Sequence, residues 1–226
     1  MCGRKTLTKD KREIIKEYNV DQSNWPDSEK YSPSYNIAPT DENPILRFKD
    51  ERYIQFMQWG LIPFWADDMA IGQKMINARS ETLQKKRTYK PLLKNQRCVV
   101  IADGFYEWKG KKGNKQPYYF FKPEHRLISF AGLWSHWESN QNKVVNSYTI
   151  ITTPASQSVE KIHDRMPAIL EQDKIDSWLD SGNTVEKALE LLKPYQDLEY
   201  YPVAKYVNSV QNNSPRCIEK QPQLFS

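Results

Sequence analysis

The residue best placed for unusual chemistry is Cys2, in the opening tetrapeptide MCGR. Removal of Met1 would leave one residue that carries both a free α-amine and a thiol. The unperturbed pKa values of these groups are about 7.7–8.0 and about 8.5, so a fraction of each is nucleophilic near neutral pH. Such a 1,2-aminothiol condenses with an aldehyde to an imine, and its sulfur then closes a five-membered thiazolidine ring. On position alone, a cysteine in a frayed terminus is the simpler interpretation.

Two segments offer groups for binding anions or developing charge. Arg4, beside Cys2, is suited to a phosphate and able to lower a thiol pKa; an exposed surface charge is the alternative. In NARSET (residues 77–82), Asn77 offers an amide for an oxyanion or hydroxyl, and Arg79 offers a bidentate fork for phosphate. The alternative for this segment is the start of a helix, because residues 80–82 resemble capping residues.

Glu107 and His163 are the candidates for proton transfer. Strand alternation places Glu107 on the same face as Phe105, so we predict a carboxyl with apolar neighbours and a raised pKa, suited to a general acid or base. A solvent-facing position on an edge strand is the alternative. His163 lies in a turn and titrates near pH 6.5 when unperturbed, so it could transfer a proton, although taken alone a capping or structural role is the safer interpretation. The other histidines, His125 and His136, have polar neighbours and are predicted at the surface.

Many short strands and few helices must position these side chains. We predict strands at residues 44–48, 52–59, 97–102, 105–109, 117–121, 127–134, 147–152, 168–170 and 198–203, and helices at 8–18, 157–161, 172–180 and 184–193. Residues 21–42 predict a long ordered loop, and residues 109–115 a hairpin tip. This order predicts an α+β fold, a single domain over residues 1–226 with a curved, barrel-like, mostly antiparallel β-sheet flanked by helices.

Composition narrows the class of protein. The 226 residues carry a net charge of +5, which is compatible with nucleic acid, and the 7 Trp, 13 Tyr and 8 Phe include several in predicted loops, where they can stack on bases. We find no membrane span and no secretory signal, and expect a cytoplasmic protein. The three cysteines are too few for a disulfide framework or zinc site; Cys98 is predicted in the core, and Cys217 is given no role. No cofactor or metal is expected.

Together the motifs resemble the SOS-response-associated peptidase (SRAP) family, whose members shield abasic sites in DNA. The resemblance rests on MCGR (1–4), YNIAPT (35–40), WGLIP (59–63), NARSET (77–82), DGFYEW (103–108), HDRMPAIL (163–170) and VNSV (207–210), in the family's order. It implies autocatalytic or aminopeptidase loss of Met1 and a covalent thiazolidine between Cys2 and the ring-opened aldehyde of an abasic site, preferentially in single-stranded DNA. It assigns substrate stabilisation to Asn77, acid–base work to Glu107 and proton transfer to His163.

DNA binding is expected to depend on the backbone rather than on base identity. We predict phosphate contacts and base stacking from residues near these motifs: Arg4, Arg79 and Arg165 for phosphates, and Tyr35, Asn36, Phe64 and Trp65 for bases. Junctions between single-stranded and duplex DNA are compatible with this surface, and the protein is expected to be a monomer that joins the nucleoid upon damage if bacterial. Two rivals remain: a cysteine peptidase with an N-terminal nucleophile, and a non-covalent single-strand-binding module.

Overall fold

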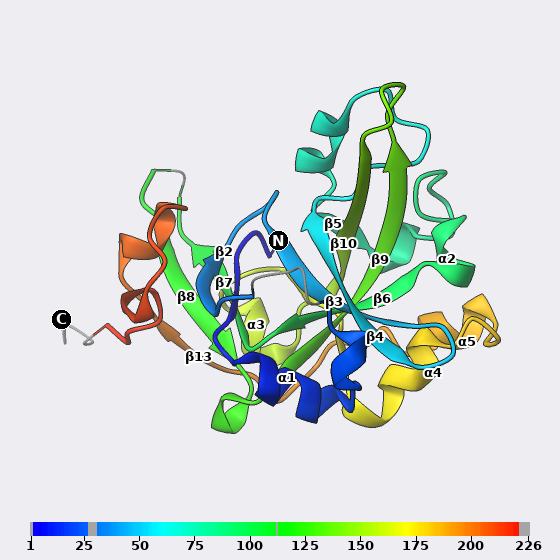
Figure 1. The fold of residues 1–226 in the computed structure, drawn as a ribbon. Coiled ribbons are helices and arrows are strands. Elements are labelled where there is room, and N and C mark those ends of the chain that lie inside the picture. The colour runs from blue at the N-terminus through cyan, green and yellow to red at the C-terminus, as the bar shows by residue number, and fades with distance from the viewer. Residues whose placement is uncertain (1, 27–30, 112, 222–226) are drawn as a thin grey trace.

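The computed structural model describes residues 2–26, 31–111 and 113–221, and β-strands dominate it (Figure 1). The strands of the first sheet are β1 (Lys5–Leu7), β2 (Ser34–Ile37), β7 (Gly104–Lys109), β8 (Gln116–Phe121) and β13 (Glu199–Pro202). Their order is β13-β8-β7-β1-β2, with every neighbouring pair antiparallel. The strand that follows Cys2 therefore lies inside a sheet, next to the DGFYEW strand.

The second sheet closes into a barrel. Its strands are β3 (Glu42–Phe48), β4 (Arg52–Trp59), β5 (Asn77–Arg79), β6 (Arg97–Ala102), β9 (Ile128–Glu138), β10 (Val144–Pro154), β11 (Arg165–Pro167) and β12 (Ile169–Leu170). Because β10 pairs with both β4 and β9, the strands β10, β4, β3, β6 and β9 form a ring without a free edge. β4 and β5 pair with β10 in parallel, and the remaining pairs are antiparallel.

Short helices pack around these sheets: α1 (Lys11–Tyr18), α2 (Leu92–Asn95), α3 (Gln157–Glu160), α4 (Ile175–Leu179) and α5 (Val185–Glu190). Helix α1 begins after Asp10, whose carboxylate accepts from the Glu13 amide (2.8 Å), while the Glu13 carboxylate accepts from the Asp10 amide (2.9 Å). This reciprocal cap satisfies donors that a helix start leaves unpaired. The helix buries Ile14 and Tyr18, one turn apart, against the core.

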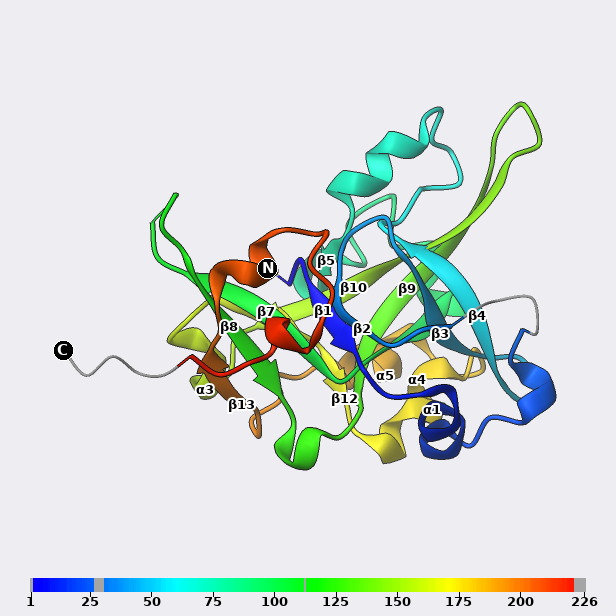
Figure 2. The same ribbon diagram turned by 60° about the vertical axis from the view of Figure 1, so that its left-hand side comes forward.

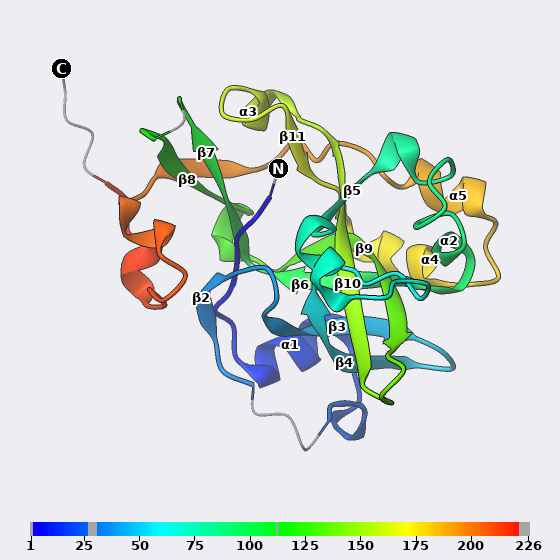
Figure 3. The same cartoon turned by 90° about the horizontal axis from the view of Figure 1, so that it is seen from above.

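The two faces of β7 are both buried, which explains why this strand can hold a polar side chain inside the protein. Phe105 packs into the main core with the barrel strands, whereas Tyr106 joins a second, smaller cluster with Tyr119 and Val207. Seen from above, the start of the described chain lies between the β7–β8 hairpin and the β5 and β11 side of the barrel (Figure 3). The first described residues therefore lie at the boundary between the two sheets, which is called the seam below.

The predicted fold class, an α+β domain with a curved, barrel-like, mostly antiparallel sheet, is confirmed by this architecture. The helix predicted at 8–18 begins only at Lys11, because Asp10 is the cap and residues 5–7 form β1. The helices predicted at 172–180 and 184–193 are shorter, α4 and α5, with a 3₁₀ turn at Gln172–Lys174. The loop predicted at 21–42 contains β2. Its residues 27–30 lie outside the described part of the chain. So do residue 112 of the predicted hairpin tip and residues 222–226 of the predicted domain.

Gly104 generates a prediction about stability. A Cβ at this position would lie 2.2 Å from the Tyr119 hydroxyl, and Tyr119 is only 2% exposed. We expect Gly104→Ala to lower the free energy of unfolding by about 1–3 kcal/mol, the usual cost of overpacking a core. Chemical denaturation measures this. Gly182→Ala is the control, because its Cβ would meet only the flexible Asp180 carboxylate, at 3.1 Å; equal midpoints for the two variants would contradict the expectation.

Candidate active site

Cys2 is held between the two sheets by its own backbone and that of its neighbour. The Arg4 carbonyl accepts from the Tyr106 amide of β7 (3.0 Å), which ties the segment to the first sheet. The Cys2 carbonyl accepts from Nδ2 of Asn77 (2.7 Å), at the start of β5 in the second sheet. Figure 2 shows the N-terminal end beside β7 and β5 from a second direction. The position of Cys2 is thus set by two strands far apart in sequence, not by a frayed terminus.

The Cys2 side chain is fully buried, and its thiol donates to the Arg4 carbonyl at 3.5 Å. Burial raises the pKa of this thiol far above its ordinary value, and the Glu107 carboxylate adds to the rise in pKa. The thiol is therefore protonated at neutral pH in this structure. A group that attacks as a thiolate must first be exposed or meet a base.

Lys5 is a further buried group that the sequence reasoning missed. Its side chain is fully buried, and its Nζ donates to the Ile101 carbonyl at 3.0 Å. Burial lowers the pKa of Lys5 to about 7, although the Asp103 carboxylate and Cys2 act in the opposite direction. A lysine at the start of a chain is usually exposed, so the only sequence signal was its place two residues before Leu7 on a buried strand.

Glu107 is buried inside the protein rather than on an edge strand facing solvent. Its side chain is 3% exposed and Oε2 lies 3.8 Å from Nε2 of His163. Burial raises the pKa of Glu107 to about 7. A carboxyl with such a pKa holds or releases its proton near physiological pH, which is the property required of a general acid or base.

His163 is brought to Glu107 by the turn between α3 and β11. Its backbone amide donates to the Val159 carbonyl (3.0 Å), and its Nδ1 accepts from the Arg165 amide (3.0 Å). Burial lowers the pKa of the imidazole, and the Asp164 carboxylate acts in the opposite direction. The pKa of the Glu107 carboxyl is raised and that of the His163 imidazole is lowered, so both shifts favour the neutral forms of the two groups.

In the Asn77 side-chain amide, the nitrogen makes a hydrogen bond to the protein and the oxygen makes none among the described residues. Nδ2 donates to the Cys2 carbonyl, whereas Oδ1 is buried and has no hydrogen-bond partner among the described residues. A buried acceptor without a partner is costly, so it is a natural position for a hydroxyl or N–H of a ligand. Asn77 lies opposite Ile150 in the parallel pair β5–β10. Of the segment 77–82, for which the start of a helix was the alternative, Asn77–Arg79 form strand β5 and Ser80–Thr82 form a short 3₁₀ helix.

The structure brings the four predicted chemical residues, Cys2, Asn77, Glu107 and His163, into two contacting pairs. Asn77 contacts Cys2, and Glu107 contacts His163. The influence of the Glu107 carboxylate on the pKa of Cys2 connects one pair with the other. A thiol, an amide acceptor and a carboxyl–imidazole pair with shifted pKa values thus lie near one another, an arrangement that could support attack on a carbonyl.

Three residues predicted to contact DNA are engaged with the loop at residues 205–213. The Arg4 guanidinium donates to Asn36 Oδ1 (2.7 Å) and to the Val207 carbonyl (3.0 Å). The Asn36 amide, in a residue 3% exposed, donates to three carbonyls of that loop, and the Tyr35 backbone amide donates to one of its side chains (2.7 Å). Their role in DNA binding stays a prediction, and the structure gives them an internal one.

Arg165 is also engaged inside the protein. It is 8% exposed, its guanidinium forms a two-pronged ion pair with Glu81, and it donates to the Thr152 carbonyl at 2.5 Å. This internal ion pair does not fit the predicted phosphate contact, because a buried guanidinium paired with a carboxylate leaves little room for a second anion. Arg79, by contrast, is exposed at the end of β5.

Phe64 and Trp65 are exposed, at 60% and 39%, on the segment that follows β4. The Arg87 guanidinium lies over the Trp65 ring, 5.8 Å from its centre. The β9–β10 hairpin, which extends away from the rest of the molecule in Figure 2, anchors this segment, because Trp137 Nε1 donates to the Ala66 carbonyl (2.6 Å). The surface therefore presents two exposed aromatic rings, one of them covered in part by Arg87, on a segment held by Trp137.

A run of exposed cations near this surface was missed from the sequence. Lys85, Lys86 and Arg87 are all exposed and follow the NARSET segment, which ends at Thr82, after two intervening residues. Their signal was the sequence QKKR, a short basic run next to a motif. Since Arg87 contacts the ring of Trp65, part of this run lies beside the exposed aromatic residues.

Within residues 2–26, 31–111 and 113–221, no group of three or more His, Cys, Asp and Glu side chains is placed to hold a metal ion. None of the helices in the same residues is long and apolar enough to cross a membrane. Cys98 and Cys217 are buried and free, and His125 and His136 are exposed, in agreement with the prediction for the two histidines.

Comparison with known proteins gives consistent matches over nearly the whole chain. A family model described as SOS response associated peptidase (SRAP) matches residues 1–210. The chain is 43% identical over 225 residues to the abasic site processing protein YoqW of Bacillus subtilis (strain 168), covering 97% of this chain and 99% of that protein. It is 39% identical over 260 residues to the abasic site processing protein HMCES of Xenopus tropicalis, covering 96% of this chain and 78% of that protein.

Solved structures share the fold. A crystal structure of a protein from Bacteroides thetaiotaomicron superposes with a TM-score of 0.83 at 24% identity, covering 98% of this chain and 100% of that chain. A phage-related protein from Bordetella bronchiseptica superposes with a TM-score of 0.70 at 28% identity, covering 89% and 94%. The architecture of two sheets is therefore found in experimentally determined structures.

The raised pKa of Glu107 predicts how its replacement changes stability with pH. Because the folded protein binds this proton more tightly than the unfolded chain, Glu107 contributes stability at low pH that is lost as pH rises from about 4.5 to about 7. We expect Glu107→Gln to gain stability relative to the unaltered protein as pH rises through this range, on the order of 1–3 kcal/mol. Chemical denaturation at pH 5 and pH 8 measures the difference; Glu138→Gln on the exposed part of β9 is the control. A difference independent of pH would contradict the assignment.

Proposed function

The chain belongs to the SOS response associated peptidase (SRAP) family, and on that premise we propose that it captures abasic sites in single-stranded DNA through a covalent bond to Cys2. Two relatives are named abasic site processing proteins, which supports the substrate class. The observation that carries the proposal is the seam in which Asn77 contacts Cys2 and Glu107 contacts His163.

The proposed reaction has two bond-forming steps. After removal of Met1, which lies outside the described residues, the α-amine of Cys2 attacks C1′ of the open-chain deoxyribose and water leaves, giving an imine. The Cys2 sulfur then adds to the same carbon, its proton passes to nitrogen, and a thiazolidine forms. Ring closure removes the imine that β-elimination needs as an electron sink, so the strand is protected rather than cleaved. Without closure, the imine would lead to lyase chemistry.

The raised pKa of Glu107 and the contacts of Asn77 and His163 support their proposed roles in moving protons. Since the pKa of Glu107 is about 7, its carboxyl can give a proton to a leaving sugar oxygen or water and take it back near neutral pH. Asn77 offers its partnerless Oδ1 to a sugar hydroxyl or to the N–H that forms on the Cys2 nitrogen, while Nδ2 holds the Cys2 backbone. His163 exchanges a proton with the sugar, and the same exchange in reverse supports release of the adduct.

The surface that supports DNA binding combines cations and aromatic rings. Arg79 is exposed at the end of β5, and the exposed cations at residues 85–87 include Arg87, which contacts the ring of Trp65. Phe64 and Trp65 can stack on or wedge beside bases next to the lesion, a contact worth about 1–3 kcal/mol per base. Exposed lysines and arginines bind phosphates of any sequence, so weak sequence preference is expected.

Peptide hydrolysis is the competing activity, because the family description includes the word peptidase. A cysteine peptidase needs a base at the thiol. In the described part of the chain, the Cys2 thiol donates to a backbone carbonyl and its pKa is raised, which does not favour a thiolate. We therefore restrict peptidase chemistry to a single removal of Met1, and expect no turnover of added peptides.

Replacement of Cys2 tests the covalent proposal directly. We expect the unaltered protein, mixed with single-stranded DNA that carries one abasic site, to gain the mass of the DNA less one water, and its free form to lack Met1. Cys2→Ser should give less adduct, lost within hours on dilution, because an oxazolidine is less stable than a thiazolidine. Intact mass spectrometry measures both properties. Cys217→Ser, a change at another buried cysteine, should behave like the unaltered protein; an equally durable Cys2→Ser adduct would exclude closure by sulfur.

Salt dependence tests the DNA surface separately from the covalent step. A tetrahydrofuran abasic analogue has no aldehyde, so its binding is purely non-covalent. We expect Arg79→Ala to weaken binding and to reduce the slope of log K against log salt by about 0.7, the value for one phosphate on a single strand. Fluorescence anisotropy at several salt concentrations measures this. Lys49→Ala, which removes an exposed cation from the β3–β4 turn, is the control, and equal slopes for both variants would place the DNA elsewhere.

A further inference from the structure

One ring nitrogen of His163 has two neighbours that require opposite proton states. The Arg165 backbone N–H donates to Nδ1 at 3.0 Å, which requires a lone pair on Nδ1. The Oδ1 of Asp164 also lies 3.0 Å from Nδ1, and a carboxylate can bond there only when Nδ1 carries a proton. Because one atom cannot satisfy both conditions at once, these are alternative partners of the ring.

The two partners differ in how firmly they are held. The Arg165 backbone is part of β11, where it pairs with Pro154 of β10, and its guanidinium is fixed by Glu81 and by the Thr152 carbonyl. Its backbone amide, which donates to Nδ1, is therefore held in a strand. The Asp164 side chain is 82% exposed and can turn toward the ring or away from it. Asp164 is thus the adjustable partner of the pair.

We propose that Asp164 is a positioning residue that switches Nε2 of His163 between proton donor and proton acceptor. With Nδ1 bound to the Arg165 amide, the neutral ring carries its proton on Nε2, which faces Glu107 at 3.8 Å. With a proton on Nδ1 held by Asp164, the neutral ring presents a lone pair at Nε2 instead. The inference rests on the proposed function, in which His163 exchanges a proton with the deoxyribose.

The switch gives a balanced proton cycle. An imidazolium whose Nδ1–H is held by Asp164 loses the Nε2 proton to the substrate and remains a neutral ring protonated on Nδ1. The same ring accepts a proton at Nε2 in the reverse direction. The form bound only to the Arg165 amide can do neither, because loss of its single proton would leave an imidazolate and its Nε2 has no lone pair to offer.

Among the described charged groups near His163, the Asp164 carboxylate is the one that lies next to Nδ1. Glu107 approaches from β7, but it faces Nε2, on the opposite side of the ring. Burial lowers the pKa of the imidazole most, and Lys115, from the β7–β8 turn, lowers it further, whereas Asp164 raises that pKa. Removal of Asp164 should therefore both remove one tautomer and make the ring harder to protonate.

The ring nitrogens can be observed directly by NMR of the full-length protein without DNA. We expect ¹⁵N–¹H correlation spectra of unaltered protein to show a population of His163 with the proton on Nδ1. In Asp164→Ala that population should vanish, and the titration midpoint should fall by about 0.5 pH unit, which is what an exposed ion pair supplies. Asp164→Asn, which keeps an acceptor without charge, should retain part of the Nδ1–H form.

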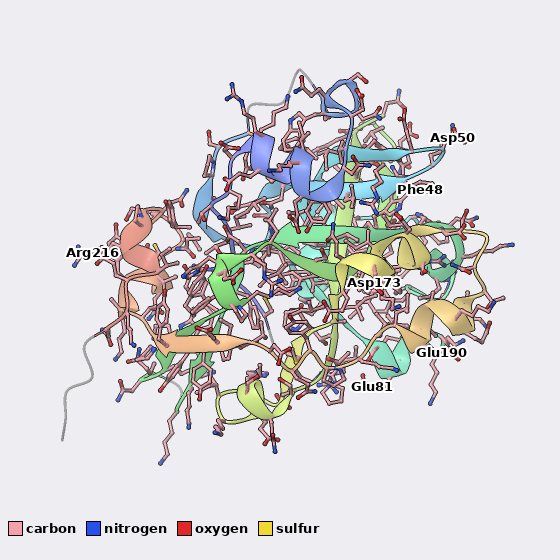
Figure 4. All side chains as sticks on the ribbon, turned by 90° about the horizontal axis from the view of Figure 1, so that it is seen from below. Phe48, Asp50, Glu81, Asp173, Glu190 and Arg216 are labelled. Carbon is pink, nitrogen blue, oxygen red and sulfur yellow. The ribbon has the colours of Figure 1, made fainter. Side chains whose placement is uncertain are left out.

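Asp50→Ala is the matched control, since Asp50 is an exposed aspartate at the end of the β3–β4 turn, on the opposite side of the molecule from Glu81, the partner of Arg165 (Figure 4). This variant should leave the tautomers and the midpoint unchanged. Asp164→Ala with the tautomer ratio and midpoint of the unaltered protein would overturn the proposal.

A kinetic experiment connects the switch to the reaction. Single-turnover capture of freshly generated abasic single-stranded DNA is followed from pH 5 to pH 8 for the same variants. We expect the acid side of the profile for Asp164→Ala to move with its NMR midpoint, slowing capture there about threefold, the factor equivalent to half a pH unit. An unmoved profile would show that the switch does not serve the reaction. If the unaltered protein forms no adduct, the proposed function fails, while the NMR result still decides whether the switch exists.

Discussion

The active seam depends on two hydrogen bonds that hold the first described residues between the sheets. The Tyr106 amide fixes the Arg4 carbonyl to β7, and the Asn77 amide group fixes the Cys2 carbonyl to β5. The first bond extends a sheet ladder and the second crosses from one sheet to the other. The crossing bond holds Cys2, which is fully buried, between the two sheets near Glu107.

Burial shifts four of the described titratable groups around Cys2 and His163 toward their neutral forms. The pKa values of the Cys2 thiol and the Glu107 carboxyl are raised, and those of the Lys5 amine and the His163 imidazole are lowered. These opposite directions have one cause, because removal from water disfavours the charged form of an acid and of a base alike. As a result, burial brings the pKa of the Glu107 carboxyl and that of the Lys5 amine both to about 7, from opposite directions.

A second layer of polar contacts keeps the seam in place. Arg165, paired with Glu81, connects the NARSET segment to the strand that follows His163, and both segments also pair with β10. Arg4 and Asn36 connect the N-terminal segment to the loop around Val207. Arginines that a sequence motif suggests for phosphate binding can therefore also make structural hydrogen bonds and ion pairs inside the protein. Arg165, which is buried, does so, whereas Arg79 is exposed.

From the sequence alone, the strand pattern, the mixed fold class and the chemical character of Cys2, Asn77, Glu107 and His163 could be predicted, because alternation, turn residues and side-chain chemistry are local properties. Contacts between residues as distant as Cys2 and Asn77 could not, since they arise from β-strand pairing across long stretches of chain. For the same reason, the burial of Lys5 and the internal ion pair of Arg165 could not be predicted from the sequence alone. Residue types and their order determine which chemistry is available; burial and distance, which only the tertiary structure decides, determine which protonation states those residues adopt.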